Sequence, residues 1–155
     1  MKLQRYNHPW CGPTALQNAL RGLGLFINQY ELVHLCDTDD DGTDEKGLQQ
    51  AIERLPVEAS EISSFNPWEA IATLDQGLRC GKAAVICVDN FDHWVAVIGR
   101  LGSRYIVIDS TNEEWNTREQ GCWSVSVQDL VQKWKASPTA ADGEAPFYGL
   151  LIERS

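Results

Sequence analysis

Three residues of the types that carry out nucleophilic catalysis stand at the ends of predicted elements: Cys11, His93 and Asp109. Cys11 directly precedes Gly-Pro-Thr-Ala and an amphipathic run, so it lies at a helix start, where the helix dipole stabilises a thiolate. His93 opens one β-branched run and Asp109 ends the next. A thiol nucleophile needs a base to share its proton, and that base needs an orienting partner. The three residues are therefore candidates for these roles.

The competing interpretation is structural, because free cysteine is among the most buried residue types and a histidine at a strand end is often only half-exposed. Two other histidines are present. His8 lies on an irregular segment three residues before Cys11, and His34 falls within a helical pattern. The coincidence of a thiol at a helix start with polar residues at two strand ends favours His93 as the base.

The catalytic hypothesis makes a geometric demand on the hairpin formed by residues 93–100 and 104–109. An odd-numbered loop such as 101–103, with Gly102 as its left-handed residue, would set Asp109 opposite Val95 and on the face of His93. Such diagonal neighbours lie about 7–8 Å apart. A strict two-residue loop would put the two side chains on opposite faces.

The elements that position these residues are helices in the first half of the chain and strands in the second. The patterns predict helices over 12–21, 28–35, 42–55, 66–78 and 126–134, capped where the signals are clearest by Asn28, Thr43, Asn66 and Ser126. They predict strands over 83–89, 93–100, 104–109 and 147–153. This order indicates an α+β fold, and the length of 155 residues indicates one domain, residues 1–155.

Composition excludes several classes of function. The net charge of −9 and the lack of a basic stripe argue against a nucleic-acid partner. No apolar run reaches the ~20 residues of a membrane span, and no leader pattern opens the chain. Five cysteines without a secretion signal predict free thiols and a cytoplasmic location. Nothing in the sequence indicates the oligomeric state.

No metal or cofactor site is expected. Cys80 and Cys87 have no CxxC or histidine partners at the spacing of a structural zinc site. The acidic run 37–45 resembles the start of a calcium loop, but its twelfth position is Leu48 where a bidentate Glu is required. We interpret this run as a solvated turn that leads into the next helix.

The stretches WCGPTA (10–15), preceded by Gln4, HWVAVIG (93–99) and YIVID (105–109) together resemble the bacteriocin-processing, double-glycine leader peptidases. These are papain-like cysteine peptidases, often fused to ABC exporters. The resemblance covers nearly the whole chain. It implies a papain-like fold in which N-terminal helices pack on a C-terminal antiparallel β-sheet.

The resemblance also implies roles for single residues. Cys11 would be the nucleophile, His93 the general base and then acid, and Asp109 the residue that orients the imidazole. Gln4 would donate to the oxyanion together with the backbone N–H of Cys11. Two departures stand out. Gln4 precedes Cys11 by one residue more than the usual spacing, and Ser110 follows Asp109 where the family commonly has proline.

No exporter or ATPase pattern accompanies these motifs, so a stand-alone enzyme is expected. The predicted function is cleavage of a peptide or isopeptide bond in a peptide or protein substrate through a thioester. A glutamine deamidase, an acyl or transglutaminyl transferase, and a non-catalytic peptide-binding domain remain alternatives. Trp10 and Trp115 are expected to line the substrate groove, whereas Trp94, on the strand face opposite His93, is expected in the core.

Overall fold

The structure, a computed structural model, describes residues 11–38, 45–88, 93–108, 122–134 and 146–155. The helices are α1 (Cys11–Gly22), α2 (Gln29–Leu35), α3 (Glu45–Glu53), α4 (Pro67–Arg79) and α5 (Val127–Trp134). The strands are β1 (Val57–Ser64), β2 (Ala83–Val88), β3 (His93–Leu101), β4 (Arg104–Ile108), β5 (Cys122–Ser126) and β6 (Phe147–Arg154).

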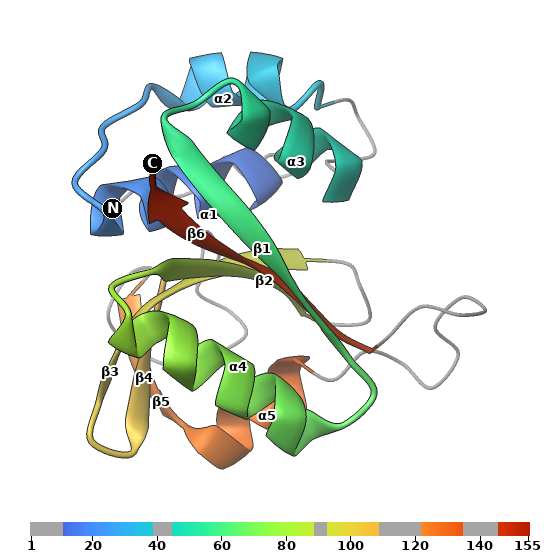
Figure 1. The fold of residues 1–155 in the computed structure, drawn as a ribbon, viewed down its shortest axis with the longest axis vertical. Coiled ribbons are helices and arrows are strands. Elements are labelled where there is room, and N and C mark those ends of the chain that lie inside the picture. Colours follow the sequence, from blue (N-terminus) through green and yellow to red (C-terminus); the bar gives the residue numbers. More distant parts are fainter. Residues whose placement is uncertain (1–10, 39–44, 89–92, 109–121, 135–145) are drawn as a thin grey trace.

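A six-stranded antiparallel sheet, ordered β1-β6-β2-β3-β4-β5, forms the centre of the molecule (Figure 1). Helices α1, α2 and α3 cover one face, and α4 and α5 cover the other (Figure 1). Each face has its own hydrophobic cluster, and the one beneath the first three helices, the α1–α3 cluster, includes Leu16, Leu48 and Ile152. Alternation along β3 divides its side chains between them, with Trp94 and Ala96 facing α1 and Val95 and Val97 facing α4 and α5. The predicted α+β class is confirmed.

Local capping signals account for several of the helix starts. The side chain of Asn28 accepts a hydrogen bond from the backbone N–H of Tyr30 at 2.8 Å. Asn66 accepts from the N–H groups of the second and third helical residues of α4. Ser126 Oγ accepts from Asp129 N at 3.1 Å and so caps α5. Thr43, the predicted cap of α3, lies outside the described residues.

Two strands, β1 and β5, were not predicted from the sequence. In β1 the four consecutive residues 58–61 are all exposed, so the alternation that indicates a half-buried strand is missing. The strand forms because its backbone pairs along its whole length with β6, from Val57 opposite Arg154 to Ser64 opposite Phe147. Strand β5 has five residues and leads directly into α5. Tertiary pairing, rather than local pattern, creates both strands.

The β3–β4 hairpin corrects the predicted loop but keeps the predicted register. The turn is the two-residue Gly102–Ser103, with Leu101 opposite Arg104 and Gly102 at φ 60°. The expectation of an odd loop was therefore wrong. A β-bulge between Val97 and Gly99 adds one unpaired residue to β3, and this shifts the pairing back by one position. Ala96 consequently lies opposite Ile108, which is the register that an odd loop would have produced.

A buried thiol in the α1–α3 cluster makes stability sensitive to alkaline pH. Cys36 is 1% exposed, and burial raises the pKa of its thiol from 9.0 to about 12. Between these two values the unfolded chain releases the proton while the folded protein retains it, so stability falls as pH rises, by at most about 1.4 kcal/mol per pH unit. Below the unfolded value this thiol contributes no pH dependence.

We therefore expect urea unfolding midpoints measured between about pH 8 and pH 11 to fall more steeply for the wild type than for Cys36→Ala. Some alkaline slope should persist in the variant, because burial also raises the pKa of Tyr105 and Tyr148. Identical slopes for the two proteins would show that the Cys36 thiol ionises as readily in the folded state as in the unfolded chain.

Candidate active site

Cys11 is a partly exposed residue at the start of a helix whose next nine residues are buried. It is the first residue of α1 and is partly exposed, whereas every residue from Gly12 to Leu20 is buried. Its thiol packs against the edge of the α1–α3 cluster. The N–H groups in the first turn of a helix have no partner within the helix, and the helix dipole favours a negative charge there. Cys11 thus differs in exposure from the buried cysteines Cys36 and Cys87.

Buried polar contacts fix α1 along its length. The side chain of Gln29 donates to Thr14 Oγ1 at 2.6 Å, and Gln17 Nε2 donates to the carbonyl oxygen of Ile27 at 2.7 Å. Thr14 and Gln17 are almost fully buried, so these bonds form in an environment where they are strong. The segment that leads into α2 thus holds the helix in place behind the thiol.

His93 is the first residue of β3 and pairs with Val88, the last residue of β2. It is 8% exposed, one of the few buried polar side chains in the described part of the chain. Alternation from Val95 assigns its side chain to the face of the sheet opposite α1. Because the residue stands at the very end of the strand, its imidazole is positioned at the end of the sheet.

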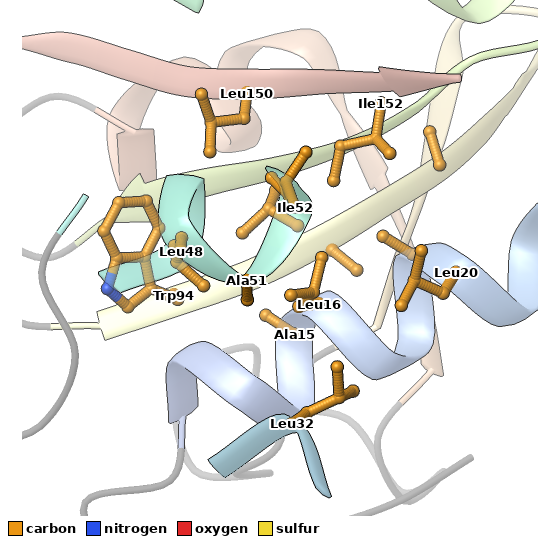
Figure 2. Close-up of a cluster of buried hydrophobic side chains, with 14 of the residues drawn as sticks. Ala15, Leu16, Leu20, Leu32, Leu48, Ala51, Ile52, Trp94, Leu150 and Ile152 are labelled. Atoms are coloured by element: carbon orange, nitrogen blue, oxygen red, sulfur yellow. The ribbon is translucent and has the colours of Figure 1, made fainter. Parts of the chain in front are cut away.

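The starts of α1 and β3 lie at the same end of a packed helix–strand pair. At the far end, a Cβ added to Gly22 would come within 3.2 Å of Ile98 Cγ2, so these two residues are in close contact. Cys11 precedes Gly22 by eleven residues of helix, and His93 precedes Ile98 by five residues of strand. The length of α1 from Cys11 to Gly22 and the length of β3 from His93 to Ile98 are both about 16–17 Å. Figure 2 shows Trp94, the neighbour of His93 in the chain, on the side of Ala15 that is away from Leu20.

Four predicted site residues, Gln4, Trp10, Asp109 and Trp115, lie outside the described residues. The last described residue before Asp109 is Ile108, which is buried and lies opposite Ala96. The structure therefore brings together the elements that carry two of the predicted catalytic residues. The catalytic and binding roles of all six site residues stay predictions.

The aromatic residues at this end of the sheet divide into buried and exposed ones. Trp94 is 5% exposed, so its predicted place in the core is confirmed. Phe65 and Trp68 are 71% and 64% exposed. They follow Ser64, which pairs with Phe147 at the same end of the sheet as the β2–β3 pair Val88 and His93. Sequence analysis gave them no role, because a helix start with an N-cap and proline explains that stretch.

The other cysteines have different environments. All five are free, as the sequence predicted. Cys36 and Cys87 are buried in the α1–α3 cluster. Cys80 is exposed and forms the C-cap of α4, and Cys122 is partly exposed on β5. Cys11 alone among them stands at a helix N-terminus.

A short ion pair lies at the opposite end of the sheet. Arg100 Nη1 and Tyr105 Oη both bind the carboxylate of Asp75, each at 2.5 Å. The guanidinium also lies 5.4 Å from the centre of the Tyr105 ring. These contacts join α4 to the β3–β4 hairpin and have a structural role.

None of the described helices is long and apolar enough to cross a membrane.

Comparison with known proteins relates this chain to a known family. The model of the Peptidase C39 family matches residues 3–135. An uncharacterized protein from Methanothermobacter marburgensis is 34% identical over 100 residues, which are 61% of this chain and 70% of that protein.

Solved structures share the fold. The peptidase domain of Streptococcus ComA, a bi-functional ABC transporter of a quorum-sensing pathway, has a TM-score of 0.69 at 17% identity, over 99% of this chain and 97% of that one. A double-glycine motif protease from an AMS/PCAT transporter, in complex with its leader peptide, has a TM-score of 0.67 at 14% identity, over 100% and 90%. A C39-like peptidase from Bacillus anthracis has 0.65 at 14% identity, over 100% and 94%.

These identities are low, so the solved structures establish the fold alone, and they agree with the predicted papain-like architecture of helices packed on an antiparallel sheet. The family match covers most of the chain and includes both Cys11 and His93. The chain belongs to the Peptidase C39 family of papain-like cysteine peptidases.

Proposed function

We propose that this protein is a cysteine hydrolase that cleaves a peptide or isopeptide bond, with Cys11 as nucleophile, His93 as general base and acid, and Asp109 as the residue that orients His93. One observation carries the proposal. In a chain of the Peptidase C39 family, the partly exposed thiol at the start of α1 lies at the same end of the helix–strand pair as the histidine at the start of β3.

The chemistry requires each of these groups in turn. His93 takes the thiol proton, and the thiolate of Cys11 attacks the carbonyl carbon of the scissile bond. The tetrahedral oxygen then needs fixed donors, each worth about 2.7–4 kcal/mol, for which we propose the N–H of Cys11 and the side chain of Gln4. The imidazolium gives its proton to the leaving amine. A water molecule, deprotonated by His93, hydrolyses the thioester and releases Cys11.

The hairpin register supports the role of Asp109. Ala96 lies opposite Ile108, so the same register continued by one residue would set Asp109 opposite Val95. Alternation assigns Val95 and His93 to one face, and diagonal neighbours on a face are within reach of His and Asp side chains. Because this face is opposite α1, we propose that thiol and imidazole meet around the end of the sheet.

The substrate we propose is a peptide or protein segment that carries positive charge. The net charge of −9 favours such a partner over an acidic one. Trp10 and Trp115 flank Cys11 and Asp109 in the sequence, and we propose that they line the groove. We further propose that residues 1–155 act as one peptidase domain in the cytoplasm, where the thiol stays reduced.

A glutamine deamidase or an acyl transferase would use the same thioester and differ only in the acceptor. We expect rapid acid quenching of the protein with fluorogenic peptides rich in basic and aromatic residues to yield an acyl adduct on Cys11, located by peptide mapping. The product then identifies the reaction. Hydrolysis adds water across a main-chain or isopeptide bond, deamidation converts a glutamine side chain to glutamate, and transfer yields a new amide. A protein that binds these peptides but forms no adduct on Cys11 would be a non-catalytic peptide-binding domain.

A further inference from the structure

We propose that Trp94 is a positioning residue that holds the start of β3, and with it His93, against the rest of the sheet. The inference rests on the proposed function insofar as His93 is the base. Trp94 does not touch the reacting atoms in this proposal. It acts through the backbone of the residue before it.

The first residues of β3 form the end of a strand. His93, Trp94 and Val95 pair with Val88, Cys87 and Ile86 of β2. Strand ends open more readily than strand centres. Two side chains bury this segment, Val95 on one face and Trp94 on the other. The indole is by far the larger of the two, so it supplies most of the contact that keeps the segment in place.

Trp94 contacts a second aromatic ring across the sheet. Its ring meets that of Tyr148 edge-to-face, with centroids 6.2 Å apart. Cys87 lies between them on β2, since it pairs with Trp94 and its neighbour Ile86 pairs with Gly149. The small side chain at this central position lets two large rings from non-adjacent strands come into contact. Figure 2 shows the indole beside Leu48 of α3.

Polar contacts fix Tyr148 in turn. Its hydroxyl donates to Glu61 Oε1 at 3.3 Å, and Gln49 Nε2 donates to Glu61 Oε1 at 2.7 Å and to the Tyr148 oxygen at 3.3 Å. Burial, and then the carboxylate of Glu61, raise the pKa of Tyr148, so the phenol keeps the proton that it donates. The start of β3 is thereby linked through two rings to β1, β6 and α3.

A small displacement at this point matters for the chemistry. Misplacing a catalytic group by about 1 Å can lower the rate about 100-fold. Shrinking the indole would let the start of β3 move without disrupting the ladders in the rest of the sheet. The consequence would be a folded protein whose thiol and imidazole are poorly aligned.

The chain offers a matched control in Tyr105. This aromatic residue is 1% exposed in the same sheet, on the strand next to β3. It pairs with Arg100, which is seven residues, or about 23 Å, along β3 from His93. Tyr105→Leu and Trp94→Leu each remove one buried ring, and only the second removes it beside the proposed base.

Two measurements on the two leucine variants test the proposal, after urea unfolding has confirmed that both fold. The first is the pH profile of Cys11 alkylation by iodoacetamide, followed by peptide mapping. We expect Trp94→Leu to lower the His93-dependent rate near pH 6 about tenfold or more, and Tyr105→Leu to change it less than about twofold. The second is amide hydrogen exchange of residues 93–95, which should accelerate about tenfold or more in Trp94→Leu alone.

A graded series extends the test to Tyr148. Tyr148→Phe keeps the ring contact and loses the hydroxyl bonds, so its effect should be smaller than that of Tyr148→Leu. Equal losses in Trp94→Leu and Tyr105→Leu, or unchanged exchange at 93–95 in Trp94→Leu, would overturn the positioning role. If alkylation of the wild type does not depend on His93, the proposed function fails, and the exchange data still decide whether Trp94 holds this segment.

Discussion

Replacing Cys11 by alanine is expected to lower turnover at least about 10⁴-fold while changing the free energy of unfolding by less than about 1 kcal/mol. Activity is lost because the sulfur forms the bond to the substrate. Stability is kept because the thiol is partly exposed at the start of α1, so its removal leaves no enclosed cavity. Peptide hydrolysis and urea unfolding of the same preparations measure the two effects.

Cys36→Ala is the matched control and should give the reverse result. Cys36 is 1% exposed inside the α1–α3 cluster, so truncation creates a void and should cost about 0.5–3 kcal/mol, whereas turnover should be unchanged. If instead Cys11→Ala proves as destabilising as Cys36→Ala and turnover persists, Cys11 is a core residue and the proposed nucleophile is wrong.

Local signals made much of the fold predictable. Asn28, Asn66 and Ser126 mark helix starts because each supplies an oxygen to free N–H groups, and the structure contains all three bonds. The buried strands β2 and β3 carry enough β-branched residues to be recognised alone. Strand β1 was missed for the opposite reason. Its exposed stretch 58–61 has no pattern of its own and becomes a strand only through its pairing with β6.

The candidate site likewise has a part that local sequence patterns predict and a part that depends on how the strands pair. Cys11 and His93 could be singled out because each begins an element with a clear local signature. The relation between β3 and β4 could not be derived from local pattern, because it depends on two features that oppose each other. The two-residue turn at Gly102–Ser103 shifts the register one way, and the bulge between Val97 and Gly99 shifts it back. A bulge is a property of the paired strands, and its position is not visible in one strand's sequence.

Selective alkylation at low pH is the second large effect that we expect. Near pH 6, iodoacetamide should modify Cys11 well ahead of the other cysteines. A free cysteine has only about 0.3% thiolate at this pH, so any group that stabilises the thiolate has a large effect on the rate. Both the N-terminus of α1 and a neighbouring imidazolium would do so. Buried Cys36, with its pKa raised to about 12 by desolvation, should remain unmodified.

Cys80 provides the critical comparison, because it is more exposed than Cys11 but lies at the C-terminus of a helix. It is the C-cap of α4, where the helix dipole disfavours a thiolate. Accessibility alone would make Cys80 react first, whereas thiolate stabilisation makes Cys11 react first. As the pH rises toward about 8.5, the pKa of a free cysteine, the preference for Cys11 should shrink.

Histidine variants separate the helix contribution from that of the imidazolium. His93→Ala should remove most of the reactivity of Cys11 near pH 6, and Asp109→Ala should reduce it less, because the imidazolium can still form. His34→Ala, an exposed histidine within α2, should leave the profile unchanged. Peptide mapping in which Cys80 is modified at least as fast as Cys11 at pH 6 would exclude an activated thiol, and the fold would then serve peptide binding without catalysis.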